Sequence, residues 1–451
     1  MSVLTIISVV GILTGLTNVR VGPLQLEDLA LLVLLGFCIS KLAGSAFSFR
    51  ISTRLTRVFW SHTLFLLTLF SLAVIAVRLT FYPLDEASFL RQPIIFSFSR
   101  LVQLGAIVCG FLWLTNVFIR QKSLLISAMN VYWWTGIVCA LYGILSYVTL
   151  SFFPFSPPAI FGAYINADNS LRLCGFFNEG GPFGLYIISV FVIGLLRRHM
   201  TGRRLGVGKI AILSVAMLLS QSKFGLLAAV LLGLYFITSA VSFKKKAFYF
   251  VLATAIFLGV AAWLDLGNQL VGYLISYQNI EEEVSVRGNS DYNLVIGRVS
   301  ALHIVPKMIA AHPVTGIGFG NYPLMRNDPL YLGGLPTVTE VEDLPGLGIP
   351  GIAAELGIPA TLWLLALLFI PYRVSRGKAT ILVVSALFQP LAHILAVQLT
   401  FFYPWFVSAC ALAASYYEDR NSRLRSEGRT HFTSSSTPQG IYPQRTLPQT
   451  E

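Results

Sequence analysis

Charged residues are scarce in this 451-residue chain: they make up 12% of it, whereas hydrophobic residues make up 55%. A soluble globular domain carries about 25% charged residues, so this composition argues against a cytosolic globular enzyme. The apolar residues form about a dozen long blocks instead of amphipathic stripes, and about 20 apolar residues suffice to cross a bilayer. The composition predicts an all-α polytopic membrane protein with about 12 transmembrane helices and one large extracytoplasmic loop.

Cysteine and metal-binding patterns are also scarce. Of five cysteines, four lie inside apolar blocks and only Cys174 lies in a loop, which excludes a disulfide scaffold. The chain has no Cys-x-x-Cys pair and no Asp-x-Asp sequence, and His62 and His393 fall in different predicted spans, without metal-ligand spacing. The glycines from Gly316 to Gly320 lack the context of a nucleotide-binding loop. We therefore expect neither a metal nor a cofactor.

The apolar blocks can be placed along the chain. Predicted spans cover residues 2–17, 24–46, 59–77, 99–119, 124–149, 182–196, 208–221, 223–241, 247–264, 351–371, 379–396 and 399–417. The first begins at Ser2 without a basic leader, so it is interpreted as a span and not as a cleaved signal peptide. A single helix over 208–241 would rise about 51 Å, more than a ~30 Å hydrocarbon core. Because Ser220–Lys223 interrupts this run and basic loops flank it, we predict a hairpin with Lys223 at its outer turn.

Charge asymmetry predicts the orientation. If both termini are cytoplasmic, 22 of the 32 Lys and Arg residues lie on the inner side and 16 of the 20 acidic residues lie on the outer side, as the positive-inside rule requires. The net charge of +12 is then a topology signal and indicates no nucleic-acid partner. We expect a multi-pass membrane protein with both termini on the cytoplasmic side.

The spans divide the chain into four parts. We predict an N-terminal transmembrane bundle (1–264), a large periplasmic loop (265–350), three C-terminal spans (351–417) and a disordered cytoplasmic tail (418–451). Within the loop, the segment Arg298–Ala311 predicts an amphipathic helix that rests on the membrane face or over a cavity and is kinked at Pro306. Its apolar residues at helical spacing are Val299, Leu302, Val305 or Ile304, and Ile309.

Charges at the membrane edge are the candidates for chemistry, because an unpaired charge there is costly. A cation (Arg172), an amide (Asn178) and an anion (Glu179) lie within eight residues on a glycine-rich backbone before a span. Such a loop suits a lipid-linked phosphate, which arginine binds in a bidentate manner. The alternative is an interfacial loop that contacts lipid headgroups. Lys223 and Arg298 face the same predicted compartment. Instead of binding phosphate, Lys223 could snorkel to the membrane interface, and Arg298 could be a solvated charge at a helix end.

Two further charges lie at predicted outer span ends. Arg100 begins the fourth span and Glu355 enters the membrane with the tenth, where Glu355 could pair with an arginine or act as a base. Several cations around a pyrophosphate would stabilise its departing charge without a metal. His312, a lone histidine before a proline, favours a structural role.

Four segments, in order, resemble the bacterial O-antigen ligase and O-antigen polymerase superfamily of integral membrane glycosyltransferases. Arg172-x-x-Gly175-Phe-Phe-Asn178-Glu179 resembles the polymerases' arginine-containing loop, and Ser220-Gln-Ser-Lys223-Phe-Gly225 resembles a Ser-Arg-Gly turn with lysine in place of arginine. Arg298 followed by Pro313-x-x-Gly316-x-Gly318 resembles the large loop's motif, and Glu355-Leu356-Gly357 resembles the Glu-x-Gly that opens the following span.

The resemblance implies an enzyme of the bacterial inner (cytoplasmic) membrane with a periplasmic active site. It would use an undecaprenyl-pyrophosphate-linked glycan donor without a metal. Ligases generally carry a histidine shortly before the Glu-x-Gly, whereas this chain has Val341–Gly346 without one, which favours a polymerase of repeat units. In that reading Arg172, Arg298 and Lys223 hold the pyrophosphate, and Glu179 is the first candidate for a base, followed by Asp343 and Glu355. Expected partners are membrane lipids, a flippase and a chain-length regulator. The alternatives are a ligase that transfers glycan to lipid A-core or protein and, more distantly, a polysaccharide-lipid transporter.

Overall fold

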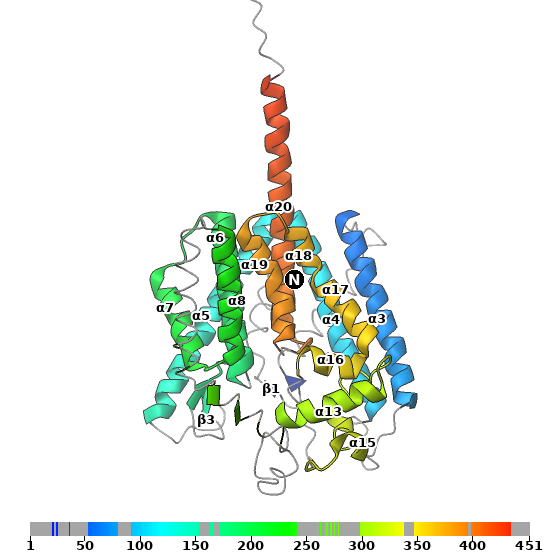
Figure 1. Ribbon diagram of the computed structural model, residues 1–451. Coiled ribbons are helices and arrows are strands. Elements are labelled where there is room, and N and C mark those ends of the chain that lie inside the picture. The colour runs from blue at the N-terminus through cyan, green and yellow to red at the C-terminus, as the bar shows by residue number, and fades with distance from the viewer. Residues whose placement is uncertain are drawn as a thin grey trace, which may run out of the picture.

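The computed structural model describes residues 20–21, 24–25, 36, 53–79, 92–152, 163–165, 171–177, 179–240, 298–337, 347–395 and 398–433, with eight single positions between 259 and 278. Within these residues the chain is a bundle of helices with two short antiparallel strand pairs (Figure 1). This confirms the all-α class. The predicted spans at 2–17, 24–46 and 247–264 lie almost entirely outside the described residues.

The described elements are short strands and helices of very different lengths. The strands are β1 (Arg20–Val21), β2 (Leu24–Gln25), β3 (Ala163–Ile165) and β4 (Leu171–Leu173). The helices of the first half are α3 (Thr53–Leu79), α4 (Pro93–Arg120), α5 (Lys122–Phe152), α6 (Gly180–Thr201), α7 (Val207–Leu219) and α8 (Lys223–Ala240). Those of the second half are α13 (Arg298–Ala311), α14 (Tyr322–Met325), α15 (Pro329–Leu332), α16 (Ile349–Leu356), α17 (Ile358–Leu368), α18 (Ile370–Ser375), α19 (Thr380–Ile394) and α20 (Phe402–Thr433).

Several helices are long and apolar enough to cross a membrane. Five segments of the described chain meet this criterion: Thr56–Val77, Pro93–Arg120, Lys122–Phe152, Gly180–Thr201 and Ile358–Ser375. Four shorter apolar helices accompany them: Val207–Leu219, Lys223–Tyr235, Val299–Ala311 and Thr380–Ile394. The chain is therefore a membrane protein, whereas the number of twelve spans stays a prediction.

Helix boundaries follow from local sequence. Pro93 occupies the first turn of α4, where its missing N–H removes no helical hydrogen bond. Gly202 ends α6 in the left-handed conformation (φ 71°) and donates its N–H to the Arg198 carbonyl at 2.8 Å. The predicted hairpin is present, because the run 208–241 divides into α7 and α8 at Ser220–Ser222, where Gln221 adopts a φ of 48°.

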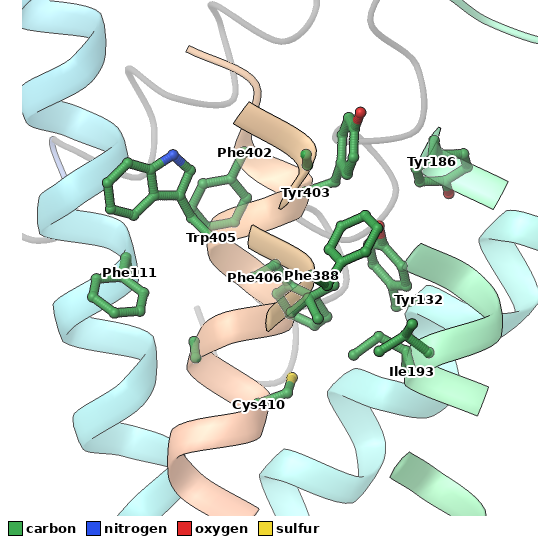
Figure 2. Packing of buried hydrophobic residues seen from close by; sticks show 14 of the residues in the cluster. Phe111, Tyr132, Tyr186, Ile193, Phe388, Phe402, Tyr403, Trp405, Phe406 and Cys410 are labelled. Atoms are coloured by element: carbon green, nitrogen blue, oxygen red, sulfur yellow. The ribbon is translucent and has the colours of Figure 1, made fainter. Parts of the chain in front are cut away.

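The core of the bundle surrounds the first half of α20. Trp405 packs edge-on against Phe111 of α4, with ring centroids 5.6 Å apart, and Phe406 stacks on Tyr132 of α5 at 4.8 Å. Figure 2 shows this aromatic cluster between α4, α5, α6 and α20. Burying such large rings dominates the energetics of packing, so α20 is the central helix against which α4, α5, α6, α18 and α19 pack.

The loops predicted to be cytoplasmic meet at one end of the bundle. There the Tyr417 hydroxyl donates to the Phe118 and Ile119 carbonyls near the end of α4, both at 2.9 Å. At the same end Lys378 forms an ion pair with Asp419 at 2.9 Å. α20 leaves the bundle at this end, whereas β3, α13 and α15 lie at the opposite end (Figure 1).

Two predicted boundaries are corrected by the structure. The predicted span 351–371 is broken at Gly357 (φ 77°), so Glu355 lies in the short helix α16 and the membrane-length segment begins at Ile358. The tail predicted to be disordered from 418 continues as helix α20 to Thr433.

Candidate functional site

The strand that carries Arg172 lies against the turn that precedes Lys223. β4 pairs with β3, with Arg172 opposite Tyr164. Gln221, in the turn, donates its side-chain N–H to the Leu171 carbonyl at 3.4 Å. A side chain at Gly180 would collide with the Ser220 carbonyl, so glycine is needed there for the start of α6 to approach the turn. The first two motifs of the sequence therefore come together.

A single hydroxyl joins the N-termini of α6 and α8. Ser222 Oγ accepts the Gly225 N–H at 3.0 Å, as a helix cap does, and donates to the Gly181 carbonyl at 2.9 Å. Gly184 lies in contact with Ser222, and Gly225 approaches the Gly184 backbone. The positive ends of two helix dipoles thus lie side by side. Because Lys223 is the first residue of α8, this end of the bundle favours an anion.

The residues between Arg172 and α6 are mainly structural. Cys174 is buried, and burial raises the pKa of its thiol to about 12, which keeps it protonated and unreactive. Phe177 is also buried, in ring contact with Tyr186 and Tyr403 at centroid distances of 5.1 and 6.1 Å. The Arg172 loop therefore rests on the aromatic core, with Phe177 as its anchor.

The third and fourth motifs also pair. The Ile317 N–H donates to the Ala354 carbonyl at 2.9 Å, and the Gly318 N–H donates to the Glu355 carbonyl at 3.0 Å. A side chain at Gly316 would collide with the Glu355 carbonyl, and one at Gly357 with the Val314 carbonyl. Both glycines have positive φ, 63° and 77°. The glycine-rich turn thus allows its backbone to pack closely against the backbone around Glu355 and Gly357.

Arg100 belongs to this second pair of motifs. A side chain at Gly320 would meet the Arg100 Cγ at 2.6 Å, so the aliphatic part of Arg100 lies directly over that glycine. Its guanidinium donates to Gln103 at 3.2 Å. Nearby, Ser97 donates to the Phe319 carbonyl at 2.7 Å. The start of α4 is therefore fixed to the glycine-rich turn.

The Glu355 carboxylate has a defined role in the local structure. Its Oε1 accepts the Tyr322 N–H at 3.2 Å, at the start of α14. Burial raises the pKa of the Tyr322 phenol, with the Glu355 charge adding to this effect and the Arg326 charge opposing it. Tyr322 and Glu355 thus form one electrostatic group with Arg326.

Arg326 is a residue that sequence reasoning missed. It is only 1% exposed, and burial lowers the pKa of its guanidinium. A buried arginine is costly unless its surroundings compensate it. Arg326 follows the glycine-rich turn by six residues and has no motif of its own; its proximity to that turn was the available signal.

The remaining predicted site residues are placed as follows. Glu179 lies exposed immediately before α6, and its carboxylate makes no hydrogen bond as a helix cap. Arg298 begins α13, as predicted, and the structure describes its backbone position. Asn178 and Asp343 lie outside the described residues. Within the described part of the chain, no group of three or more His, Cys, Asp or Glu side chains is arranged to hold a metal ion.

Both pairs of motifs occupy the same end of the bundle. Figure 1 shows β3, beside the Arg172 strand, and α13 with α16 on the side opposite to the protruding α20. No protein-family model, no curated protein and no solved structure matches this chain. Support for a function therefore comes from these geometric pairings and from the resemblance carried by the four segments.

Proposed function

We propose that the protein is a metal-independent membrane glycosyltransferase that polymerises undecaprenyl-pyrophosphate-linked oligosaccharide repeat units of an O-antigen or exopolysaccharide. The reaction would take place on the periplasmic face of a bacterial inner membrane. The observation that carries this proposal is the pairing of the four motif segments, two by two, at one end of the bundle. Packing in a membrane does not by itself require that a cation-bearing strand, two helix N-termini and a carboxylate lie at the same end.

The donor's pyrophosphate would bind between Arg172 and Lys223. The arginine offers a bidentate, planar contact, and the lysine offers a point charge at the start of α8. The adjacent N-termini of α6 and α8 add partial positive charge that requires no reorganisation during the reaction. Arg298, at the start of α13, would supply a third cation. Together these groups stabilise the negative charge that develops on the leaving group.

The transfer step exchanges one C–O bond for another. An acceptor hydroxyl attacks the anomeric carbon of the donor glycan, the bond from that carbon to the pyrophosphate oxygen breaks, and undecaprenyl pyrophosphate leaves. The hydroxyl proton passes to Glu179, whose exposed carboxylate lies at the start of α6. A positioned base contributes about 10²–10⁴-fold to such a reaction. Glu355, already bonded to the Tyr322 N–H, and Asp343 are the next candidates.

A reconstituted assay tests the proposal. Purified protein in liposomes receives lipid-linked repeat units, with excess chelator in one arm, and the products are separated by length. We expect a ladder of polymers in both arms. Single units transferred only to added lipid A-core would show a ligase instead. Movement of intact lipid-linked units across the bilayer without new glycosidic bonds would show a transporter. Either result overturns the proposal.

A further inference from the structure

A dense group of cations lies between α6 and α7. Five Lys or Arg residues occur from Arg197 to Lys209, and residues 180–264 contain no Asp or Glu. Arg203 and Arg204 are exposed in the connection 202–206, at the end of the bundle where α20 protrudes (Figure 1). Because charged residues make up only 12% of the chain, this concentration of positive charge indicates a surface that attracts anions.

Lys209 lies over an indole ring of the neighbouring helix. Its ammonium is 3.8 Å from the ring centroid of Trp134, and the two residues belong to α7 and α5, which pack against each other. The indole is 51% exposed. Tryptophan is enriched at the level of the lipid headgroups, and a lysine there extends its ammonium toward the phosphates. The contact is also a cation–π interaction, which orients the ammonium. The pair therefore indicates the level of a lipid headgroup.

Exposed apolar side chains continue from this pair along both helices. On α5, Val138 and Leu141 follow Trp134 by four and seven residues, so these three lie on one face of the helix. On α7, Ile210 and Leu218 are also exposed. A soluble anion gains nothing from an apolar surface beside its charge, whereas the acyl chains of a phospholipid cover such a surface. The combination of charge and apolar area favours a lipid.

The start of α7 leaves room for a phosphate. Gly206 precedes the helix with a φ of 79°, and a Cβ at Gly208 would meet no atom within 4 Å. The first N–H groups of a helix have no partner inside the helix, and Gly206 has no side chain that could cap them. The helix dipole favours negative charge at this point. Lys209, in the first turn of α7, adds a full positive charge.

We propose that the start of α7, with Lys209, Trp134 and the two arginines of the connection 202–206, is a binding site for cardiolipin, the anionic phospholipid with two phosphates. Lys209 and the first N–H groups of α7 bind one phosphate, and the arginines bind the other. The acyl chains lie along the exposed faces of α5 and α7. Two linked phosphates engage both groups of cations at once, which the single phosphate of phosphatidylglycerol cannot do. The inference does not depend on the proposed glycosyl transfer, because this site lies at the opposite end of the bundle from the Arg172 strand.

Native mass spectrometry of the detergent-solubilised full-length protein tests the site. The protein is titrated with tetraoleoyl cardiolipin and, at twice the concentration to match the phosphates, with dioleoyl phosphatidylglycerol. We expect one cardiolipin to bind per chain, more tightly than phosphatidylglycerol. Lys209→Gln should weaken its binding about fivefold, the effect of one cation near a lipid phosphate. Replacing Arg203 and Arg204 together by Gln should weaken it about 25-fold on the same basis. Lys209→Arg, which keeps the charge, should bind like the wild type.

The matched control removes a cation elsewhere at the same end of the bundle. Arg376, exposed in the connection 376–379, should tolerate replacement by Gln without a change in cardiolipin affinity. Three results would overturn the inference. Equal weakening by Arg376→Gln and Lys209→Gln would show that cardiolipin follows only the overall positive charge. Wild-type affinity in both the Lys209 and the double arginine variants would remove these cations from any lipid site. Equal affinities for cardiolipin and phosphatidylglycerol at matched phosphate would show that the second phosphate contributes nothing.

Discussion

Two glycines near the start of α6 differ in what a methyl group would meet. At Gly184 it would overlap Ser222 and lie 3.1 Å from Ser220 Oγ, whereas at Gly181 it would meet nothing within 4 Å. Overpacking a tight contact costs about 1–3 kcal/mol. We expect Gly184→Ala to lower the thermal midpoint of the detergent-solubilised protein and the polymerisation rate, with Gly181→Ala close to wild type. Equal midpoints for the two variants would contradict the close approach of α6 and α8.

The shape of the Arg172 cation can be separated from its charge. If this arginine binds pyrophosphate through its planar fork, Arg172→Lys should lower turnover although the charge remains, and Arg172→Ala should lower it about ten- to a hundredfold. Lys223→Arg should be tolerated, because the resembled turn carries arginine there. Arg376→Ala, exposed in the connection at the opposite end, is the control. The variants are compared at equal protein levels in membranes. Wild-type turnover in Arg172→Ala would refute the proposed binding of pyrophosphate by Arg172.

The link between α13 and α15 depends on the protonation of His312. Burial lowers the pKa of His312 below its ordinary value of 6.5, although Asp328 acts in the opposite direction. The folded state therefore binds this proton less tightly than the unfolded state, so stability falls as the pH drops below about 6.5 and continues to fall until the lowered pKa is passed. A neutral imidazole can also accept a hydrogen bond from the Tyr331 hydroxyl at Nε2, whereas a protonated imidazole cannot.

The pH dependence of stability tests this role of His312. The thermal midpoint of the wild type should decrease from pH 7.5 to pH 5.5, and His312→Gln should show a smaller decrease. At pH 7.5 the variant should itself be less stable, by about 0.5–1.5 kcal/mol for one lost hydrogen bond. Identical pH profiles for the two proteins would show that His312 does not sense pH.

Some elements could be predicted from sequence and others could not. Helical spacing predicts α13 with its observed limits, yet Leu302 is exposed whereas Met308 is buried. Periodicity identifies an apolar residue but not which neighbour covers it, and here Tyr331 and Ala354 cover the Met308 side. The break before Ile358 is not predicted, because Gly357 lies inside the long predicted span 351–371. The Val314 carbonyl, which a side chain at Gly357 would meet, belongs to a segment about 40 residues away in the sequence.

At the scale of the whole molecule, the order of the motifs can be read from the sequence but their partners cannot. Gly184 meets Ser222 and Gly316 meets Glu355 across about 40 residues each, and neither spacing carries a local signature. Hydrogen bonds hold both pairings, and each glycine permits a close approach that a side chain would block. The charge count, by contrast, is a global property, and it separates the chain into two ends before any contact is known.

The orientation of these ends is the last prediction. The connections at 120–122, 202–206 and 376–379 lie at the end where α20 leaves the bundle, and each contains two Lys or Arg residues. The positive-inside rule predicts that this end is cytoplasmic, and we therefore expect β4, α13 and α16 on the periplasmic side. A reporter that is active only in the periplasm should therefore work when fused near residue 320 and fail near residue 203 or after residue 420. A reporter that is active only in the cytoplasm should give the reverse pattern. Periplasmic reporter activity near residue 203 would show that α7 and α8 have the opposite orientation. Lys223 would then lie on the cytoplasmic side and could not belong to the donor site.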